Sequence, residues 1–196
     1  MANYTFDRAF TDAVHNKIAL TKIYEPLNWQ PYLLDTKKAK EIDLFKGIDY
    51  VFTHEGKYKT VQERFREQKY QQYSDFTIRY RRDENPIADR RASEYYKMKA
   101  QYFVYGIING NKEQLAEASD FIKYAVIDLQ KVYQQLDTGN IVIVNNGKNV
   151  CKIENNKMIC PVKFNTDGSS SFFPIDINLL VKLYSSDILI AQKGFF

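Results

Sequence analysis

Two runs of alternating apolar and polar residues, at 47–52 and 60–66, stand out in the first half of the chain. Alternation with a period of two is typical of a β-strand that buries one face. The segment 54–57 between them is polar and contains one glycine, which is typical of a tight turn. A third alternating run follows at 75–80. We therefore predict that the three runs form a three-stranded meander.

Apolar residues at helical spacing predict two long helices, at 5–24 and 112–136. Pro26 ends the first of them, because the residue before a proline disfavours the helical conformation. Shorter helices are predicted at 93–99 and 176–183.

Strands are predicted again after the third run. The segment 101–108 is continuously apolar and aromatic, which favours a strand buried on both faces. From residue 140 onwards β-branched residues and turn signals alternate at short intervals, which predicts further strands at 141–144, 150–154, 157–162 and 187–192.

The chain has two cysteines, Cys151 and Cys160. A two-residue turn at Asn155 and Asn156 would place them directly opposite each other on one face of a hairpin. Contact between two reduced thiols is the favoured interpretation. A redox or metal role stays open, although a metal site would need further ligands.

These elements predict a mixed α/β protein. A chain of 196 residues is of single-domain length and can bury a real core. Within that domain we expect a core at 1–139 and a β-rich C-terminal extension at 140–196. The extension forms either a second small sheet or an addition to the first.

The amino-acid composition excludes several classes of protein. Hydrophobic residues make up 44% of the chain, which excludes a disordered chain. No apolar run approaches the length of a membrane span, and the N-terminus lacks a basic-then-apolar signal. We expect a reduced, cytoplasmic setting without a membrane partner. The net charge of +4 permits a polyanionic partner without requiring one.

The second run carries the candidate chemistry. Because side chains on a strand alternate, Gln62, Arg64 and Arg66 share one face, and Glu63 lies on the other. Antiparallel pairing would bring Asp49 near Gln62 or Arg64. An acidic oxygen, a second oxygen ligand and a cation would then converge, as a hydrated Mg²⁺ and a phosphate require.

At these residues the chain resembles the PD-(D/E)XK nuclease superfamily, the restriction endonuclease-like group. The pattern of that superfamily is an Asp at a strand start, a spacer, an acidic residue or Gln, any residue, and Lys. Here it corresponds to Asp49 followed by Gln62-Glu63-Arg64. The segment 97–106 looks like the later core strand of such proteins, and the resemblance covers about residues 5 to 135.

The resemblance implies a restriction endonuclease-like core, with element order αβββαβ and a mixed central sheet flanked by helices. It implies a bacterial or phage nuclease that hydrolyses phosphodiester bonds of DNA with Mg²⁺, or with Mn²⁺ in its place. Asp49 and Gln62 would bind the metal, with Glu63 as the reserve ligand. Arg64 would stabilise developing charge. The expected partner is double-stranded DNA, and a homodimer is compatible with the sequence.

Two residues depart from the pattern. Gln62 is a neutral amide where a carboxylate is commoner, and Arg64 stands where Lys is expected. Arginine stays protonated and cannot serve as a base. These departures favour two alternatives: a catalytically inactive nucleic-acid-binding protein with the nuclease fold, or an accessory protein of a phage or mobile element.

Arginines gather in one third of the chain, next to the predicted site. We give equal weight to two interpretations of these arginines: they contact phosphates, or they form a solvated face whose charge is balanced by nearby acids. The predicted nucleic-acid contacts are Arg66, Arg79, Arg81 and Arg82. Three carboxylates could also lie near the metal, although surface charge is favoured for each: Asp12, Glu25 and Asp43.

Overall fold

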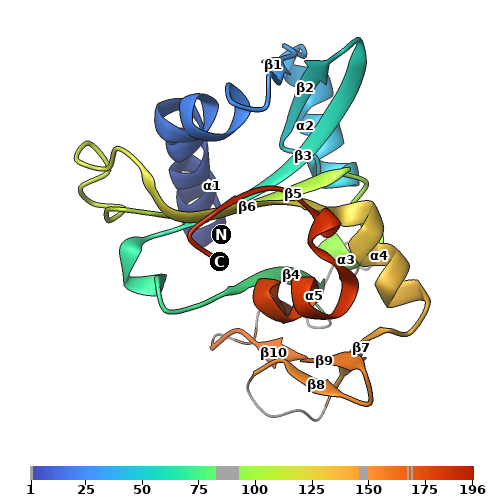
Figure 1. Cartoon of the computed structure of the whole chain (residues 1–196). Helices are drawn as coiled ribbons and strands as arrows, with labels where there is room; N and C mark the ends of the chain where they lie inside the picture. The colour runs from blue at the N-terminus through green and yellow to red at the C-terminus, as the bar shows by residue number, and fades with distance from the viewer. Residues whose placement is uncertain (1, 83–92, 146–149, 167, 169) are drawn as a thin grey trace.

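The structure is a computed structural model, and it describes residues 2–82, 93–145, 150–166, 168 and 170–196. In this part of the chain the strands form one six-stranded sheet and two three-stranded sheets. Figure 1 shows α1 on one side of the large sheet, with α4, α5 and the smaller sheets on the other. The predicted α/β class with a mixed central sheet is confirmed.

The six-stranded sheet has the strand order β1-β2-β3-β5-β6-β12. Only β3 and β5 run parallel among its described pairs, and the other neighbours are antiparallel. Its strands are β1 (Gln30–Pro31), β2 (Tyr50–His54), β3 (Lys57–Arg66), β5 (Tyr102–Ile108), β6 (Phe121–Asp128) and β12 (Leu189–Lys193).

The predicted hairpin between the first two runs is confirmed as β2 and β3, but the predicted meander is wrong. The third run forms strand β4 (Asp75–Arg81), which pairs with β11 (Ser171–Asp176) in a separate sheet. The place beside β3 belongs to β5, whose residues from 103 to 108 are all buried. Strand β5 is apolar and aromatic on both faces, whereas β4 carries Arg79 and Arg81 on one face.

The helix predicted at 5–24 is confirmed, with a change of helix type along its length. It begins as α1 (Ala2–Val14) and continues as a π-helix, η1 (His15–Tyr24). Buried residues of η1 recur at intervals of four or five, which suits the i→i+5 hydrogen bonds of a π-helix. They are His15, Ile18, Ala19, Ile23 and Tyr24.

The long helix predicted at 112–136 is wrong. Strand β6 occupies its centre, and only the last part is helical, as α4 (Leu129–Asp137). Because β6 lies between β5 and β12 with both faces covered, its sequence is apolar apart from Lys123 and Asp128 and fits a helical stripe as well as a strand. Asp128 caps α4, since its carboxylate accepts from the N–H groups of Gln130 and Lys131.

Each face of the large sheet has its own hydrophobic core. One lies between the sheet and α1 with η1, and it includes Val14, Ile18, Phe52, Val61, Phe65, Val104 and Phe121. The other lies between the sheet, the smaller sheets, α4 and α5, and it includes Phe76, Ile78, Phe103, Ile107, Ile127, Phe173 and Leu180. Strand β3 therefore presents its two sets of side chains to two different environments.

The C-terminal segment contributes to every sheet. Strand β12 extends the large sheet, and β11 pairs with both β4 and β10 (Lys163–Phe164). Strands β7 (Ile141–Val144), β8 (Lys152–Glu154) and β9 (Lys157–Pro161) form the third sheet. Both arrangements considered for this segment, a small sheet and an extension of the first, are therefore present.

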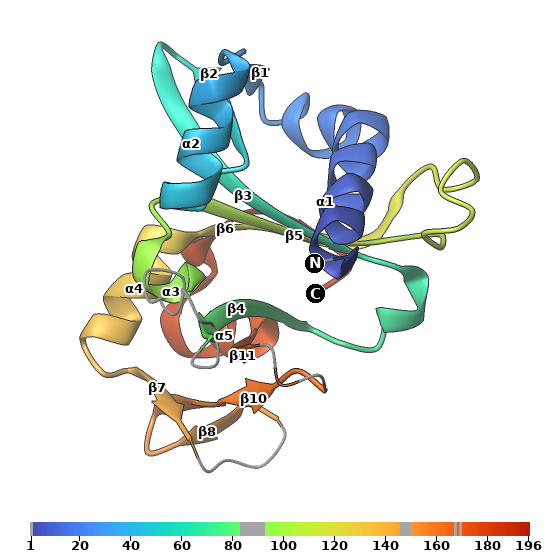
Figure 2. The ribbon, with the colours of Figure 1, turned by 180° about the vertical axis from the view of Figure 1, so that it is seen from behind.

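The remaining helices are short, apart from α2. They are α2 (Thr36–Lys46), η2 (Gln68–Tyr70), α3 (Glu94–Lys97), α5 (Ile177–Tyr184) and η4 (Ser186–Ile188). The predictions at 93–99 and 176–183 are confirmed by α3 and α5. Among the described residues, we find no helix with the length and apolarity that a membrane crossing demands. Figure 2 shows α2 beside the β2–β3 hairpin, at the end of the sheet where the candidate site lies.

Gly106 on β5 tests how tightly the α1-side core is packed. A Cβ atom at this position would lie 2.7 Å from Phe121 Cε1 and 3.1 Å from Phe65 Cδ1. We expect Gly106→Ala to lower the free energy of unfolding by about 1–3 kcal/mol, because the rings must move in a packed core. Chemical denaturation measures the loss. Adding Phe121→Leu should recover part of it, and an unchanged midpoint in the single variant would contradict this packing.

Candidate functional site

Pairing of β2 with β3 places Asp49 at the start of the hairpin. Tyr50 lies opposite Val61, and the Asp49 N–H donates to the Val61 carbonyl at 2.8 Å. The Asp49 Oδ2 atom accepts a hydrogen bond from the Glu63 N–H at 2.7 Å. The Asp49 carboxylate therefore accepts a hydrogen bond from the backbone of β3, as a carbonyl of a neighbouring strand would. This bond fixes the carboxylate at the end of the β2–β3 pair.

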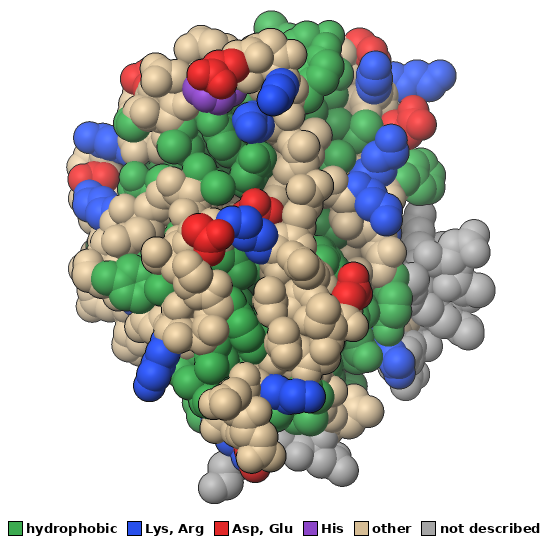
Figure 3. All heavy atoms as spheres, turned by 45° about the vertical axis from the view of Figure 1, so that its right-hand side comes forward, with side chains coloured by type: hydrophobic (Ala, Val, Ile, Leu, Met, Phe, Trp, Pro, Cys, Tyr) green, Lys and Arg blue, Asp and Glu red, His purple; other side chains and the backbone are tan. Residues whose placement is uncertain are grey.

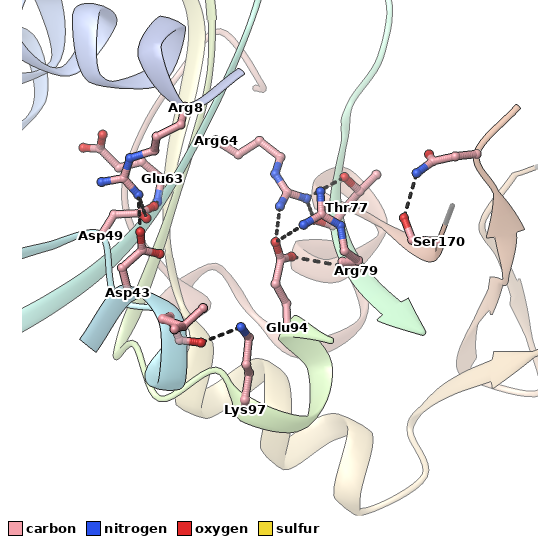
Figure 4. Close-up of polar contacts among 12 residues, drawn as sticks. Arg8, Asp43, Asp49, Glu63, Arg64, Thr77, Arg79, Glu94, Lys97 and Ser170 are labelled. Atoms are coloured by element: carbon pink, nitrogen blue, oxygen red, sulfur yellow. Dashed lines mark hydrogen bonds and ion pairs between the residues drawn. The ribbon is translucent and has the colours of Figure 1, made fainter. Parts of the chain in front are cut away.

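Arg8 of α1 brings three carboxylates together. Its Nη1 atom contacts Asp43 Oδ2 at 3.2 Å and also contacts Asp49 Oδ1, and its Nε contacts Asp12 Oδ1 at 2.9 Å. Asp43 comes from α2 and Asp12 from the same helix as Arg8. Figure 4 shows the Arg8 guanidinium turned toward Asp43 and Asp49, with Glu63 beside it.

Burial makes the charge on Asp49 costly. The side chain is 3% exposed, and this burial raises its pKa to about 7 although Arg8 opposes the shift. Burial also raises the pKa of Asp43. Burial by itself would lower the pKa of Arg8, but the neighbouring carboxylates raise it, so the guanidinium is permanently charged. This cation compensates the charge of the buried Asp49 and the half-buried Asp43.

The π-helix η1 supplies partners for Glu63. The Oε1 atom of Glu63 lies 2.9 Å from His15 Nδ1, and it accepts a hydrogen bond from the Tyr24 hydroxyl. Burial and the carboxylate of Glu63 raise the pKa of Tyr24, which therefore stays a donor. The other oxygen of Glu63, Oε2, is buried and has no hydrogen-bond partner. A buried carboxylate oxygen without a partner is costly, and it points to a missing ligand.

Tyr50 joins the two groups of side chains. Its ring stacks on His15 with a centroid distance of 3.6 Å, and its hydroxyl donates to Asp12 Oδ1 at 2.5 Å. The rotamers of His15 and Asp12 are thereby restrained, so the polar cluster is held by packing on several sides.

The other face of β3 carries the remaining predicted residues. Arg64 donates from Nη2 to Glu94 Oε1 at 2.7 Å and from Nη1 to Thr77 Oγ1 at 3.0 Å. Gln62 is buried beside Gly47 and Met98 on this face. The prediction that Gln62, Arg64 and Arg66 share a face opposite Glu63 is confirmed.

Glu94, the first residue of α3, is the centre of this second polar group. Its Oε2 accepts from the Arg79 N–H at 3.0 Å, and its Oε1 lies 3.8 Å from Arg79 Nη1. Burial would raise the pKa of Glu94, but the cations of Arg64 and Arg79 lower it. Glu94 therefore ties β3, β4 and α3 together as an ionised carboxylate (Figure 4).

The predicted nucleic-acid contacts lie on β3 and on or just after β4. The Arg66 guanidinium lies 5.4 Å from the Tyr105 ring centroid, and Arg81 lies 5.0 Å from that of Tyr80. Arg82 is half-buried. The pKa of Lys97 is lowered mainly by the burial of Lys97 and next by the charge of Arg82. Arg90 and Arg91 lie outside the described residues. The face in Figure 3 shows spaced Lys and Arg side chains among acidic and apolar ones.

The structure thus brings Asp49 together with Glu63 and Asp43, while the side chain of Gln62 lies on the face of β3 opposite Glu63. Sequence reasoning missed three residues of the cluster, namely Arg8, His15 and Tyr24. His15 and Tyr24 lie on the helix face that packs against the sheet. Their place on that face was only a weak indication in the sequence that they contact the site. No pattern indicated that Arg8 would meet acids 35 and 41 positions away.

The donor set fits a divalent cation in kind. Carboxylate oxygens of Asp43 and Asp49 already converge on one cationic atom, Arg8 Nη1, and Glu63 Oε2 has no partner. Hard cations such as Mg²⁺ prefer such oxygens. In the described ranges, no three or more His, Cys, Asp or Glu side chains are grouped so that they could hold a metal ion. Arg8 lies at the point where such an ion would have to bind.

Comparison of the chain with protein-family models, with curated proteins and with solved structures gave no match.

Proposed function

We propose that this chain is a metal-dependent nuclease that hydrolyses phosphodiester bonds of DNA. The observation that carries the proposal is the convergence of Asp43 and Asp49 on one cationic point, beside Glu63 with its unpartnered oxygen. This cluster lies at the start of β2 and against β3, where the motif resemblance locates the metal.

The order of elements supports a restriction endonuclease-like core. Helix α1, strands β2, β3 and β4, helix α3 and strand β5 follow one another in the order αβββαβ, with the two-residue strand β1 and helix α2 inserted before β2. The parallel pairing of β3 with β5 gives a mixed central sheet, and helices flank both of its faces. The pairing of β4 with β11, outside that sheet, departs from the expected core.

In this proposal Asp49 and Glu63 bind the metal, and Asp43 is the other carboxylate that Arg8 Nη1 contacts. A bound divalent cation supplies Lewis-acid stabilisation of a phosphate and a more acidic water. His15 and Tyr24 orient the Glu63 carboxylate through Oε1, which leaves Oε2 for the ion. Gln62, the second predicted ligand, has its side chain on the face of β3 opposite Glu63, beside Gly47 and Met98, so we assign the metal to Asp49 and Glu63.

Arginines take positioning and phosphate-binding roles. Arg64 already uses both Nη atoms on Thr77 and Glu94, so its role is to hold β4 and α3 against the sheet. Arg66, Arg79, Arg81 and Arg82 would contact the DNA backbone, because a guanidinium forks over phosphate oxygens. Such contacts fix the position of the DNA and carry no sequence preference.

The test is a cleavage assay on plasmid, linear duplex and single-stranded DNA, with Mg²⁺ or Mn²⁺ or with a chelator. We expect product only with metal and none from Asp49→Asn, because the amide keeps the shape and the acceptor for the Glu63 N–H but removes the charged ligand. Asp187→Asn is the matched control. Asp187 is an exposed carboxylate paired with Lys131 of α4, and it contacts none of the residues of the cluster in the described contacts.

Circular dichroism must show that Asp49→Asn is folded, so that loss of product is a loss of chemistry. Cleavage by Asp49→Asn at the wild-type rate would contradict the assignment of the site. Cleavage by the wild type in the presence of chelator would contradict the requirement for metal.

A second candidate function is nucleic-acid binding without cleavage. It is favoured by Arg8, which already neutralises Asp43 and Asp49, and by Arg64, which stands in place of the expected lysine. It predicts binding that weakens as salt rises, no metal-dependent product, and equal binding by wild type and Asp49→Asn. The same preparations, measured by fluorescence anisotropy with labelled duplex, decide between the two functions.

A further inference from the structure

The β8–β9 hairpin holds the two cysteines side by side. Its turn residues Asn155 and Asn156 have φ angles of +50° and +58°, as a two-residue hairpin turn requires. The ladder pairs Glu154 with Lys157 and continues to Lys152 opposite Ile159. One step further, Cys151 lies opposite Cys160, and the two Sγ atoms are 3.9 Å apart. The predicted contact between the cysteines is therefore confirmed.

The position of this pair in the ladder suits a disulfide. Pairs in an antiparallel ladder alternate between hydrogen-bonded and non-hydrogen-bonded types. The pair next to the turn is hydrogen-bonded, so the cysteine pair, three steps away, is of the non-hydrogen-bonded type. Opposite Cα atoms of that type are about 4.5 Å apart, within the range that a disulfide spans. Side-chain rotation is then sufficient to join the sulfurs.

The surroundings give the two thiols different access. Cys160 is fully buried in the core on the α4 and α5 side, and Cys151 is half-buried. Cys151 directly precedes β8, the edge strand of its three-stranded sheet. The Cys151 thiol also donates to the Pro174 carbonyl of β11 at 3.1 Å. The neighbouring thiol and burial raise the pKa of Cys160. Because Cys151 is the more exposed of the two thiols, it is the first that a peroxide can reach.

We propose that Cys151 and Cys160 form a reversible dithiol–disulfide site that small peroxides oxidise. The Cys151 thiolate attacks one oxygen of hydrogen peroxide, an S–O bond forms, the O–O bond breaks, and the leaving hydroxide takes up a proton to become water. Cys160 then attacks the sulfenic sulfur, the S–S bond forms, and the S–O oxygen leaves as a second water with the Cys160 proton. Two thiols are oxidised, and one peroxide is reduced to two waters.

Oxidation alters how the small sheet is held. The disulfide ties the edge strand β8 covalently to β9 and removes the hydrogen bond from Cys151 to Pro174 on β11. Because the crosslink restricts the unfolded chain, the oxidised protein should melt at a higher temperature than the reduced protein. The site is independent of the metal cluster, so its test does not depend on nuclease activity.

The experiment treats the purified full chain with hydrogen peroxide, then measures free thiols with a chromogenic thiol reagent and the intact mass. We expect both thiols to disappear, the mass to fall by two hydrogen atoms without dimer formation, and dithiothreitol to restore both thiols. Cys151→Ser should instead keep the buried Cys160 thiol at the same peroxide dose. This variant keeps the buried residue Cys160, and circular dichroism checks that it is folded.

Two outcomes would overturn the proposal. One is a wild-type protein whose mass rises by oxygen atoms in place of the loss of two hydrogens. The other is a Cys151→Ser variant that loses its remaining thiol as fast as the wild type loses both, since Cys160 would then react without its neighbour.

Discussion

Replacing Arg8 with alanine is expected to lower the free energy of unfolding by about 3 kcal/mol in the absence of divalent metal. The Asp49 side chain is 3% exposed, and Arg8 is the cation that it contacts directly. Without the guanidinium, Asp43 and Asp49 lose their compensating charge in a poorly solvated place. Urea denaturation at neutral pH, followed by tryptophan fluorescence, measures the loss.

Divalent metal should then stabilise the variant more than the wild type. If the ion binds where the guanidinium lies, metal at about one hundred times its Kd would return about 2.7 kcal/mol. We expect Mg²⁺ or Mn²⁺ to raise the melting temperature of Arg8→Ala and to shift the wild type less, because Arg8 competes with the ion for the carboxylates.

Two controls separate this effect from general ion binding. The double variant Arg8→Ala with Asp49→Asn should lose the metal response, since it lacks a ligand. Arg66→Ala removes an arginine from the other face of β3, where it lies over the Tyr70 and Tyr105 rings, and should respond to metal as the wild type does. An Arg8→Ala protein that is as insensitive to metal as the wild type would contradict the proposed metal position.

Replacing Glu94 with alanine is expected to destabilise the fold by about 3–5 kcal/mol at neutral pH. The change leaves Arg64 without its carboxylate partner and leaves the N–H of Arg79 without its acceptor. Because Glu94 joins β3, β4 and α3, the loss should appear as a lower midpoint of a single unfolding transition. Glu154→Ala is the matched control, because Glu154 is exposed and its pair with Lys152 is worth at most about 1 kcal/mol.

The contribution of Glu94 should also depend on pH. Its folded-state pKa is lowered from the ordinary value of 4.5, so its stabilising effect is present above that value and is lost as the pH falls through the folded-state pKa. Denaturation curves at neutral and acidic pH should therefore show the wild type and Glu94→Ala converging in acid. A difference that stays constant with pH, or that is under about 1 kcal/mol at neutral pH, would contradict the ionised role of Glu94.

Local patterns were sufficient where polar and apolar residues alternate along the element or a turn has characteristic residues. The alternation at 60–66 predicted both the strand and the division of its side chains, which β3 realises with Glu63 toward η1 and Arg64 toward Thr77. The Asn155–Asn156 turn likewise predicted the contact of the two cysteines. In each case the relevant partners are near in sequence, so period and turn chemistry determine the geometry.

For strand β6, whose two faces are both covered, the hydrophobic pattern did not distinguish a strand from a helix. The run at 121–128 is apolar apart from Lys123 and Asp128 because β6 lies inside the sheet, and this run was predicted as part of a helix. The strand that pairs with β3 was also not determined by local sequence. The neighbour of β3 is β5, which begins at residue 102, and β4 pairs instead with β11, about a hundred residues further along the chain.

The sequence by itself determined where β2 and β3 lie, how β3 divides its polar side chains, and that Asp49 stands at the start of the hairpin. Only the tertiary structure decided that Arg8 meets Asp43 and Asp49 and that His15 and Tyr24 meet Glu63. These contacts join residues 35 to 48 positions apart. They arise because the first helix packs across the sheet, and such packing depends on the fit of whole surfaces rather than on any local period.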